Sequence, residues 1–487
     1  MKSSISGFLI VLAGCLSVYG QNKQLLYDFN EIPQGLMVNP GMQMSYQWYA
    51  GVPLLSGIAV QAGTSGITVN DIFADDGIDI NLKIRERAVF GLSKRDEFGA
   101  TVQLEILNGG FRSGNGHGDF YSFGIYLEED LITYWPQDLA ILGYEGNADN
   151  LGRRFNLGHL KTRGELLSVF HFGVNRQVRN NLTLGARGKI YSSIFNFNST
   201  RNKGHFVTNE GQNNLLSNTL VADMMLRTSG LKEIEEILDD DTVDSGSAIA
   251  SLLRKRALLG GNLGLGFDVG FSYNLNEQTI ITGSLLDVGF IYHTKDIETV
   301  TLKGEATVEG VEVIFPEALV DPNRDFWQDL VDEVEGLVPF ETTDKSYISF
   351  RPTKLYGSIR HDFGKPLNGG GVLDCDCTYN GKGSKSVNRA KYTNSVGGQV
   401  YVINRPRGPQ AALTAFYQRR FGNGLAVKAA YTADKFSFTN IGLGVNVQAG
   451  PVNFYLMADN LLAYRNIADS HYASLQFGLN IISWGSK

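Results

Sequence analysis

Apolar and polar residues alternate along many stretches of this chain. In residues 263–273, LGLGFDVGFSY, the odd positions hold Leu, Phe, Val or Tyr, and the even positions hold Gly, Asp or Ser. Residues 441–449 and 473–481 repeat the pattern. Because neighbouring side chains of a strand point to opposite faces, this alternation predicts β-strands with one apolar and one polar face.

The character of the two faces predicts a transmembrane antiparallel β-barrel, an all-β fold. A soluble sandwich also alternates, so the period alone does not decide the class. The stretches, however, are roughly as long as a tilted strand that crosses a bilayer. Their apolar faces are almost uninterrupted, and their polar faces carry Gly, Asn, Tyr and isolated charges, as a lumen would. In lipid, only a closed barrel satisfies every backbone group of a sheet.

The pattern gives 14 strands, an even number, as in single-chain bacterial barrels. An alternative is 16 strands, with 43–63 folded as a hairpin around Pro53 and a further strand at 215–228. The predicted strands are 43–63, 98–107, 119–127, 165–175, 181–195, 262–273, 279–292, 346–361, 394–404, 410–419, 424–432, 439–449, 451–459 and 471–483.

The connections between these strands separate the two ends of the barrel. Short turns at 177–180, 274–278, 422–424 and 450–451 fall at alternate connections, which places them on one side, and short turns are typical of the periplasmic side. A barrel over 42–483 then has a periplasmic loop at 363–393. Its long extracellular loops are 64–97, 128–164, 196–261 and 293–345.

Small helices are predicted in these extracellular loops. Asp321 and Pro322 are placed to begin a helix over 322–338, with an apolar stripe at Phe326, Leu330 and Val334. Two shorter helices are predicted at 231–238 and 247–258. Such loops could cap the pore or dock a partner, or they could fold on themselves to resist proteolysis.

The first 20 residues predict export. Lys2 precedes an apolar core at 8–13, and small residues lead to a cleavage site, as in a signal peptide. Residues 12–15 also resemble a lipoprotein box ending in Cys15. We favour cleavage after Gly20, because a lipid on Cys15 would add little to a protein that a barrel already holds in the membrane.

Composition supports strands and argues against nucleic acid. The chain has 57 Gly, 21 Tyr and 28 Phe but only 12 Pro, which suits many strands rather than disorder. The net charge is −7, whereas a nucleic-acid-binding protein presents a basic face.

Charged residues on the polar strand faces are the candidate site. They could form a lining that selects solutes or holds the N-terminal segment, but an internal network of ion pairs is the favoured interpretation, because buried charges are nearly always paired. The predicted lumen-lining residues are Arg187, Lys189, Asp268, Asp287, Lys428 and Asp459.

Other candidate chemistry is sparse. Cys375 and Cys377 could form a strained disulfide on the periplasmic side, and they lack the further ligands of a metal site. The aspartates of 71–79 resemble a calcium loop only loosely, and a solvated acidic loop is favoured. The sequence contains no HExxH pair, GxSxG elbow or P-loop, so we expect neither an enzyme nor a cofactor or metal.

Several stretches resemble an uncharacterised family of bacteroidete outer-membrane proteins, a domain of unknown function. They include NKQLLYDFNEIPQGLMVNPG at 22–41, WYAGVPLLSG at 48–57, LGHLKTRGELLSVFHFG at 157–173 and RPRGPQAALTAFYQRR at 405–420. The resemblance covers nearly all of the mature chain. It implies a barrel akin to the FadL and PorV group, with 14 strands and an N-terminal segment in the lumen.

The resemblance leaves two classes of function open. A FadL-like barrel, embedded in outer-membrane lipid, would pass hydrophobic or amphipathic solutes passively, with residues 21–41 as a luminal plug. A PorV-like barrel would be a partner or scaffold of a secretion (type IX-like) or surface complex. The first requires an apolar pocket in the lumen and a kink or gap in a strand, whereas the second requires an exposed apolar patch on the external loops.

Overall fold

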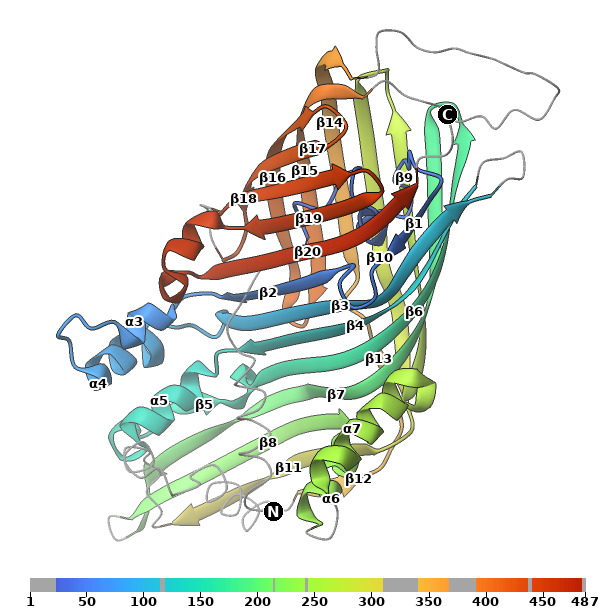
Figure 1. Cartoon of the computed structure of the whole chain (residues 1–487). Coiled ribbons are helices and arrows are strands. Elements are labelled where there is room, and N and C mark those ends of the chain that lie inside the picture. Colours follow the sequence, from blue (N-terminus) through green and yellow to red (C-terminus); the bar gives the residue numbers. More distant parts are fainter. Residues whose placement is uncertain are drawn as a thin grey trace, which may run out of the picture.

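Antiparallel strands close into a barrel in the computed structural model, which describes residues 23–113, 119–212, 215–240, 244–309, 340–367, 391–436 and 440–483 (Figure 1). The strands are β1 (Trp48–Gly51), β2 (Ile58–Thr64), β3 (Glu97–Arg112), β4 (Phe120–Tyr134), β5 (Arg154–Asn156), β6 (Lys161–Arg179), β7 (Leu182–Glu210), β8 (Leu216–Ser229), β9 (Asn262–Asn274), β10 (Thr279–His293), β11 (Ile297–Glu309), β12 (Glu341–Thr343), β13 (Tyr347–Phe350), β14 (Lys354–Pro366), β15 (Tyr392–Arg405), β16 (Gly408–Phe421), β17 (Leu425–Ala433), β18 (Asn440–Ala449), β19 (Val452–Asp459) and β20 (Tyr472–Ser483).

The ring has 14 strand positions in the described part of the chain, as the sequence predicts. Its order is β1/β2, β3, β4, β6, β7, β9, β10, β13/β14, β15, β16, β17, β18, β19 and β20, and β20 pairs back to β1 and β2. Strands β1 and β2 share one position because both pair with β20 and β3. The alternative of 16 strands is wrong: 43–63 is not a hairpin, and β8 lies outside the ring, between β7 and β11.

Alternation along the strands separates lipid from lumen as predicted. In β9, Leu265 and Phe267 point outward and are exposed, whereas Asp268 points inward and is buried. In β18, Ile441 is exposed and Asn446 is buried. An outer surface of exposed Leu, Phe, Val and Ile on successive strands is the surface that a bilayer covers.

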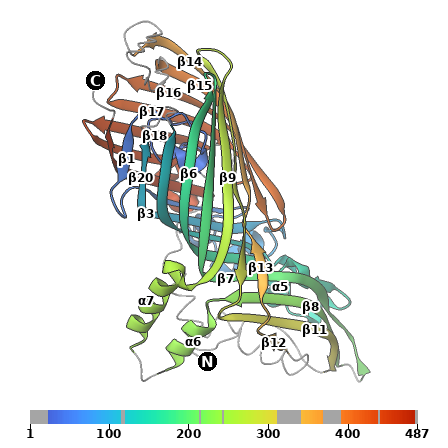
Figure 2. The same cartoon turned by 90° about the vertical axis from the view of Figure 1, so that its right-hand side faces the viewer.

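The two ends of the barrel differ, as Figures 1 and 2 show. At one end, tight turns join β6 to β7, β16 to β17 and β18 to β19, and we call this the short-turn end. Strand β7 is 29 residues long and continues past the ring at the opposite, long-loop end. There it forms a sheet with β5, β8, β11 and β12. Much of the predicted loops 128–164, 196–261 and 293–345 is therefore strand.

Short helices lie at the long-loop end and, in the case of α2, in the lumen. They are α2 (Gly35–Val38), α3 (Val69–Phe73), α4 (Ile80–Lys83), η1 (Ile84–Val89), α5 (Gln137–Glu145), η2 (Ala148–Asn150), η3 (Leu157–His159), α6 (Lys232–Asp239), α7 (Ser245–Lys255), η5 (Arg256–Gly260), η6 (Leu461–Arg465) and η7 (Ile467–Asp469). Helices α6 and α7 lie where two were predicted, whereas the helix predicted at 322–338 falls outside the described residues. None of the described helices is both long enough and apolar enough to cross a bilayer.

Candidate functional site

Residues 23–46 fold inside the barrel, and we call this segment the plug (Figure 1). Its apolar side chains are covered by luminal residues of the barrel strands from β14 to β19. Leu25, Leu26 and Phe29 are almost fully buried there, and the ring of Tyr27 stacks on that of Tyr356 with centroids 4.8 Å apart. The wall residues of this contact include Tyr356, Tyr401, Phe416, Tyr455 and Met457, which we call the aromatic wall.

The second half of the plug is held through its backbone carbonyls. Arg187 donates hydrogen bonds to the carbonyls of Leu36 (3.1 Å) and Met37 (2.8 Å). Asn175 donates to the carbonyls of Pro40 (2.7 Å) and Met42 (2.9 Å). Wall side chains thus supply the donors that this irregular backbone lacks, and buried carbonyls need such partners.

Two glycines of the wall allow the plug to come this close. A Cβ added at Gly185 would lie 1.9 Å from the carbonyl oxygen of Pro40, and one at Gly270 would lie 2.2 Å from Oδ1 of Asn39. Any larger residue at these two positions would displace the plug, which explains the choice of Gly at both.

Four of the six predicted lumen-lining residues form one chain of ion pairs. Arg187 bonds Asp268, Lys189 lies 2.9 Å from Asp268 and 2.5 Å from Asp287, and all four side chains are buried. Asp287 sits at a bulge of β10 with a φ of 58°, which turns its carboxylate toward this cluster. The pairing agrees with the favoured interpretation of a network.

The chain of ion pairs continues across the lumen through residues that the sequence interpretation missed. Lys354 lies 2.8 Å from Asp287 and 3.2 Å from Glu128, and Arg351 pairs with Glu128 (2.8 Å) and Glu165. Arg351 falls in the break between β13 and β14, and Glu128 falls where an external loop was predicted. Burial alternates along β4 beyond residue 127, but residues 128–130 are all acidic, so the sequence carried no alternation that could have placed Glu128 in the lumen.

The remaining two predicted lumen residues are buried but lie apart from this chain. Lys428 donates to the carbonyl of Tyr27, and its ammonium lies 4.1 Å from the centroid of the Phe416 ring. Asp459 accepts a hydrogen bond from Ser474 (2.6 Å). Lys428 therefore contacts the plug, whereas Asp459 bonds a neighbouring strand of the wall.

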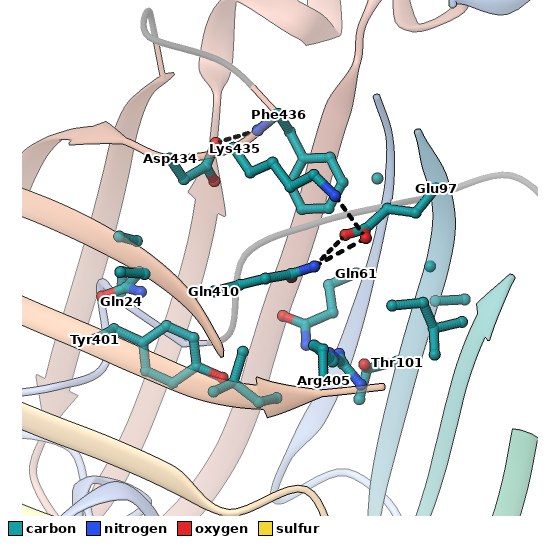
Figure 3. A pocket seen from close by; sticks show the side chains of 17 residues that line it. Gln24, Gln61, Glu97, Thr101, Tyr401, Arg405, Gln410, Asp434, Lys435 and Phe436 are labelled. Carbon is teal, nitrogen blue, oxygen red and sulfur yellow. Dashed lines mark hydrogen bonds and ion pairs between the residues drawn. The ribbon is translucent and has the colours of Figure 1, made fainter. Parts of the chain in front are cut away.

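A small cavity lies between the plug and the long-loop end, and we call it the mouth cavity. Figure 3 shows Gln410 and Lys435 pointing at the carboxylate of Glu97, to which both bond (2.6 Å each). The cavity is lined by apolar Ile132, Ile403, Ala412 and Phe436, by Tyr401, by polar Gln61, Thr101 and Arg405, and by Gln24 of the plug. This lining suits a small molecule with both apolar and polar parts.

The barrel wall is interrupted between β1 and β2. Residues 52–57 leave the ladder, and Leu54 and Leu55 are about half exposed on the outside. Inside, Glu105 accepts hydrogen bonds from Ser56 (3.0 Å) and from Gln34 of the plug (3.1 Å). We call 52–57 the strand break; it lies against the plug, and backbone hydrogen bonds to Leu479 hold it shut.

The other candidate residues either make local structural contacts or lie outside the described residues. Cys375 and Cys377 belong to 368–390, which the structure does not describe. Asp71 and Asp79 cap α3 and α4, and Asp76 pairs with Lys83, so these carboxylates serve local contacts. Within the described ranges, no group of three or more His, Cys, Asp or Glu could hold a metal ion.

The fold and the site define a transmembrane β-barrel whose lumen holds a folded N-terminal plug. Residues 40–459 match the model of a family of unknown function, DUF5723, and the chain belongs to that family. No curated protein matches the chain.

Solved barrels show a distant likeness. The chain is similar to the Ralstonia pickettii toluene transporter TbuX at 10% identity, with 96% of this chain and 98% of that chain covered and a TM-score of 0.39. A Pseudomonas aeruginosa FadL homologue is 9% identical, with 93% of this chain and 94% of that chain covered and a TM-score of 0.38. The P. putida toluene transporter TodX is 8% identical, with 96% of this chain and 93% of that chain covered and a TM-score of 0.36. At such low identities and TM-scores, the likeness does not extend to activity.

Proposed function

We propose that this protein is an integral outer-membrane barrel, exported by a signal peptide cleaved after Gly20, through which small hydrophobic or amphipathic solutes pass without catalysis. The mouth cavity is the observation that carries the proposal. It faces the long-loop end, combines Tyr401, Ile403 and Phe436 with a polar rim, and is closed below by Gln24 of the plug. A solute that enters from outside would therefore meet a binding site before it meets the plug.

The strand break offers an exit from this cavity. From Gln61, which lines the cavity, the luminal face of β2 and β3 leads to the break. Two contacts of the plug lie across that route: Lys23 bonds Gln103, and Gln34 bonds Glu105. Displacement of the plug would free both contacts and uncover the inner side of the break, so the solute would leave sideways into lipid or downward past the plug.

Deletion of 24–38 tests the role of the plug. We expect the variant to assemble, as judged by heat-modifiability on a gel, and to show a higher conductance than the wild type in planar bilayers. A deletion of 70–84, which is matched in length and removes α3 and α4 at the long-loop end, should leave the conductance unchanged. An assembled plug deletion with conductance still near zero would remove solute passage.

A second candidate function is that of a partner or scaffold in a secretion (type IX-like) or surface complex. It is supported by apolar side chains on the external segments: Phe73 is 70% exposed and Leu462 is 62% exposed. Helix α3 lies beside η7, where Asn70 donates to Asp469 (3.5 Å), and η6, which carries Leu462, is the neighbour of η7. Large exposed apolar surfaces mark sites of interaction.

The same 70–84 deletion tests this second function. If the protein is a complex subunit, the wild type in mildly solubilised native membranes should migrate above its own mass on a native gel, and the deletion should abolish the shift. A wild type that migrates as a single barrel would exclude a stable complex of this kind.

A further inference from the structure

A second cavity opens to solvent at the long-loop end, and every titratable residue that lines it is basic. We call it the basic cavity. Four separate segments supply these residues: the loop before β3, the helix η3, the outer part of β7 and the turn between β15 and β16. The residues are Lys94, His159, Lys203, His205 and Arg407. Such a concentration is unexpected in a chain with a net charge of −7.

Arg407 ties three of these segments together. Its guanidinium donates to the carbonyls of Lys94, Gly158 (3.3 Å) and His159 (3.0 Å), and it lies 4.7 Å from the centroid of the Tyr134 ring. These partners are carbonyls and a ring face rather than a carboxylate. The guanidinium therefore fixes the shape of the cavity and makes no direct ion pair within the described residues, although the carboxylate of Glu97 attracts it without touching it.

His159 presents a hydrogen-bond donor to the same cavity. Its Nδ1 accepts from the backbone N–H of Asp138 (3.3 Å), which places the proton of the neutral ring on Nε2. Burial, together with the nearby charges of Lys94 and Arg407, lowers the pKa of His159, and Asp138 opposes this shift.

Within the described residues, no carboxylate forms an ion pair with the lysines of the cavity; Glu97, for example, bonds Gln410 and Lys435. Asp138 lies 3.6 Å from Nδ1 of His159, but it also accepts from the backbone of Asn156 (2.9 Å) and lies 3.8 Å from Arg153. Asp223 is the cross-strand partner of Lys203 on β8, yet no ion pair joins them in the part of the chain that the structure describes. The exposed ammonium groups of Lys94 and Lys203 thus remain available to a ligand.

We propose that the basic cavity binds a phosphate group. A phosphate offers several acceptor oxygens in a compact, highly charged unit, which matches convergent lysines around an anchored arginine. The group could belong to the headgroup of a lipid in the outer leaflet or to a phosphorylated solute outside the membrane. This binding does not depend on solute passage through the lumen.

The test is calorimetric titration of the full-length protein in phosphate-free maltoside micelles with inorganic pyrophosphate. We expect saturable binding that weakens with added salt, and a loss of affinity of about tenfold for each of Lys94→Ala and Lys203→Ala. Both lysines are exposed, so both variants should assemble. The matched control is Lys232→Ala, an exposed lysine of α6 at the same end of the barrel, which should bind as the wild type does.

The proposal is overturned if the wild type shows no saturable binding, or if the Lys94→Ala/Lys203→Ala double variant binds as tightly as the Lys232→Ala control. A second pyrophosphate titration, in micelles that contain phosphatidic acid, shows whether the bound phosphate group belongs to a lipid headgroup or to a soluble molecule. Competition by the doped lipid assigns the site to a headgroup, and unchanged binding of pyrophosphate assigns it to a soluble phosphate.

Discussion

The two walls of the lumen hold the same plug with different balances of packing and hydrogen bonding. The aromatic wall covers the apolar first half of the plug, from Leu25 to Ile32, mainly by packing, and Lys428 and Arg360 add hydrogen bonds to two carbonyls there. The opposite wall, which we call the charged wall, is made of β4, β6, β7, β9 and β10. It binds carbonyls of the second half through side chains such as Arg187 and Asn175, and Met37 packs among its apolar residues. Packing is non-directional and tolerates small shifts, whereas hydrogen bonds to carbonyls fix position.

This difference follows from the plug itself. Leu25, Leu26, Phe29 and Ile32 must be removed from water, and the lumen is the nearest apolar cover. The later residues, around Pro40, make few backbone hydrogen bonds of their own, so their carbonyls require donors from the wall. If the plug moves during function, we expect it to release the carbonyl contacts before the packed contacts.

The largest effect is expected where the charged wall loses a buried cation. Arg187→Ala leaves two plug carbonyls without donors and weakens the compensation of buried Asp268. Breaking a buried ion pair costs about 3–5 kcal/mol, so the free energy of unfolding, measured by guanidinium titration in vesicles, should fall by about that amount.

Arg176→Ala is the matched control for this variant. Arg176 also pairs with an aspartate, Asp119, but its side chain is 54% exposed, so the loss should be much smaller. Equal losses for Arg176 and Arg187 would mean that the buried network does not stabilise the barrel.

The next effect concerns the aromatic wall. Leu25→Ala creates a cavity in the packed contact between plug and wall, and such changes cost about 2–5 kcal/mol. The expected result is faster proteolytic cleavage of the plug while the barrel stays assembled. Leu413→Ala on the outer face of β16, where the side chain is 64% exposed, should have little effect, because lipid fills the space. Equal cleavage of both variants would contradict the packing role of Leu25.

The barrel could be predicted from the sequence because each strand lies between two different environments. Lipid on one side and a polar lumen on the other impose the period of two, and residues such as Phe267 and Asp268 report it directly. Beyond the ring, the strands no longer separate lipid from a polar lumen, and the alternation no longer predicts them. The outer part of β7 and strands β8 and β11 are covered by helices and by each other. The outer part of β7 and β11 were therefore assigned to loops, and β8 entered only the 16-strand alternative, at 215–228.

The partners within the lumen could not be predicted in the same way. Alternation placed Arg187 and Lys189 inside the barrel, but the chain of ion pairs joins residues that are far apart in sequence, such as Arg351 and Glu165. Which luminal charges meet depends on the shape of the closed ring. The strand break had a signal in Pro53, but the prediction ran one strand through it and took it as a hairpin only in the 16-strand alternative. A proline cannot show that both flanking segments pair with the same neighbours.

A smaller effect is expected for Asn175, which makes two of the carbonyl contacts of the charged wall. Asn175→Ala leaves the carbonyls of Pro40 and Met42 without these donors, at a cost of about 1–3 kcal/mol for an unsatisfied buried group. Hydrogen exchange should then speed up in residues 40–44 more than in residues 25–32. Gln177→Ala, on the same strand but bonded only to an exposed turn carbonyl, is the control. Uniform exchange along the plug would show that its two halves are released together.

The smallest effect separates the two contributions of Tyr27, the plug tyrosine that packs on the aromatic wall. Tyr27→Phe keeps the ring stacked on Tyr356 and removes the hydroxyl, which accepts a hydrogen bond from Thr282 (3.2 Å). Thr282 still has Asp28 as an acceptor, so the loss should be about 0.5–1 kcal/mol. Tyr27→Leu removes the stacked ring as well and should cost about 0.5–1.5 kcal/mol more. If Phe and Leu destabilise the plug equally in the proteolysis assay, the hydroxyl rather than the stacked ring anchors this half, and the two walls would hold the plug by the same means.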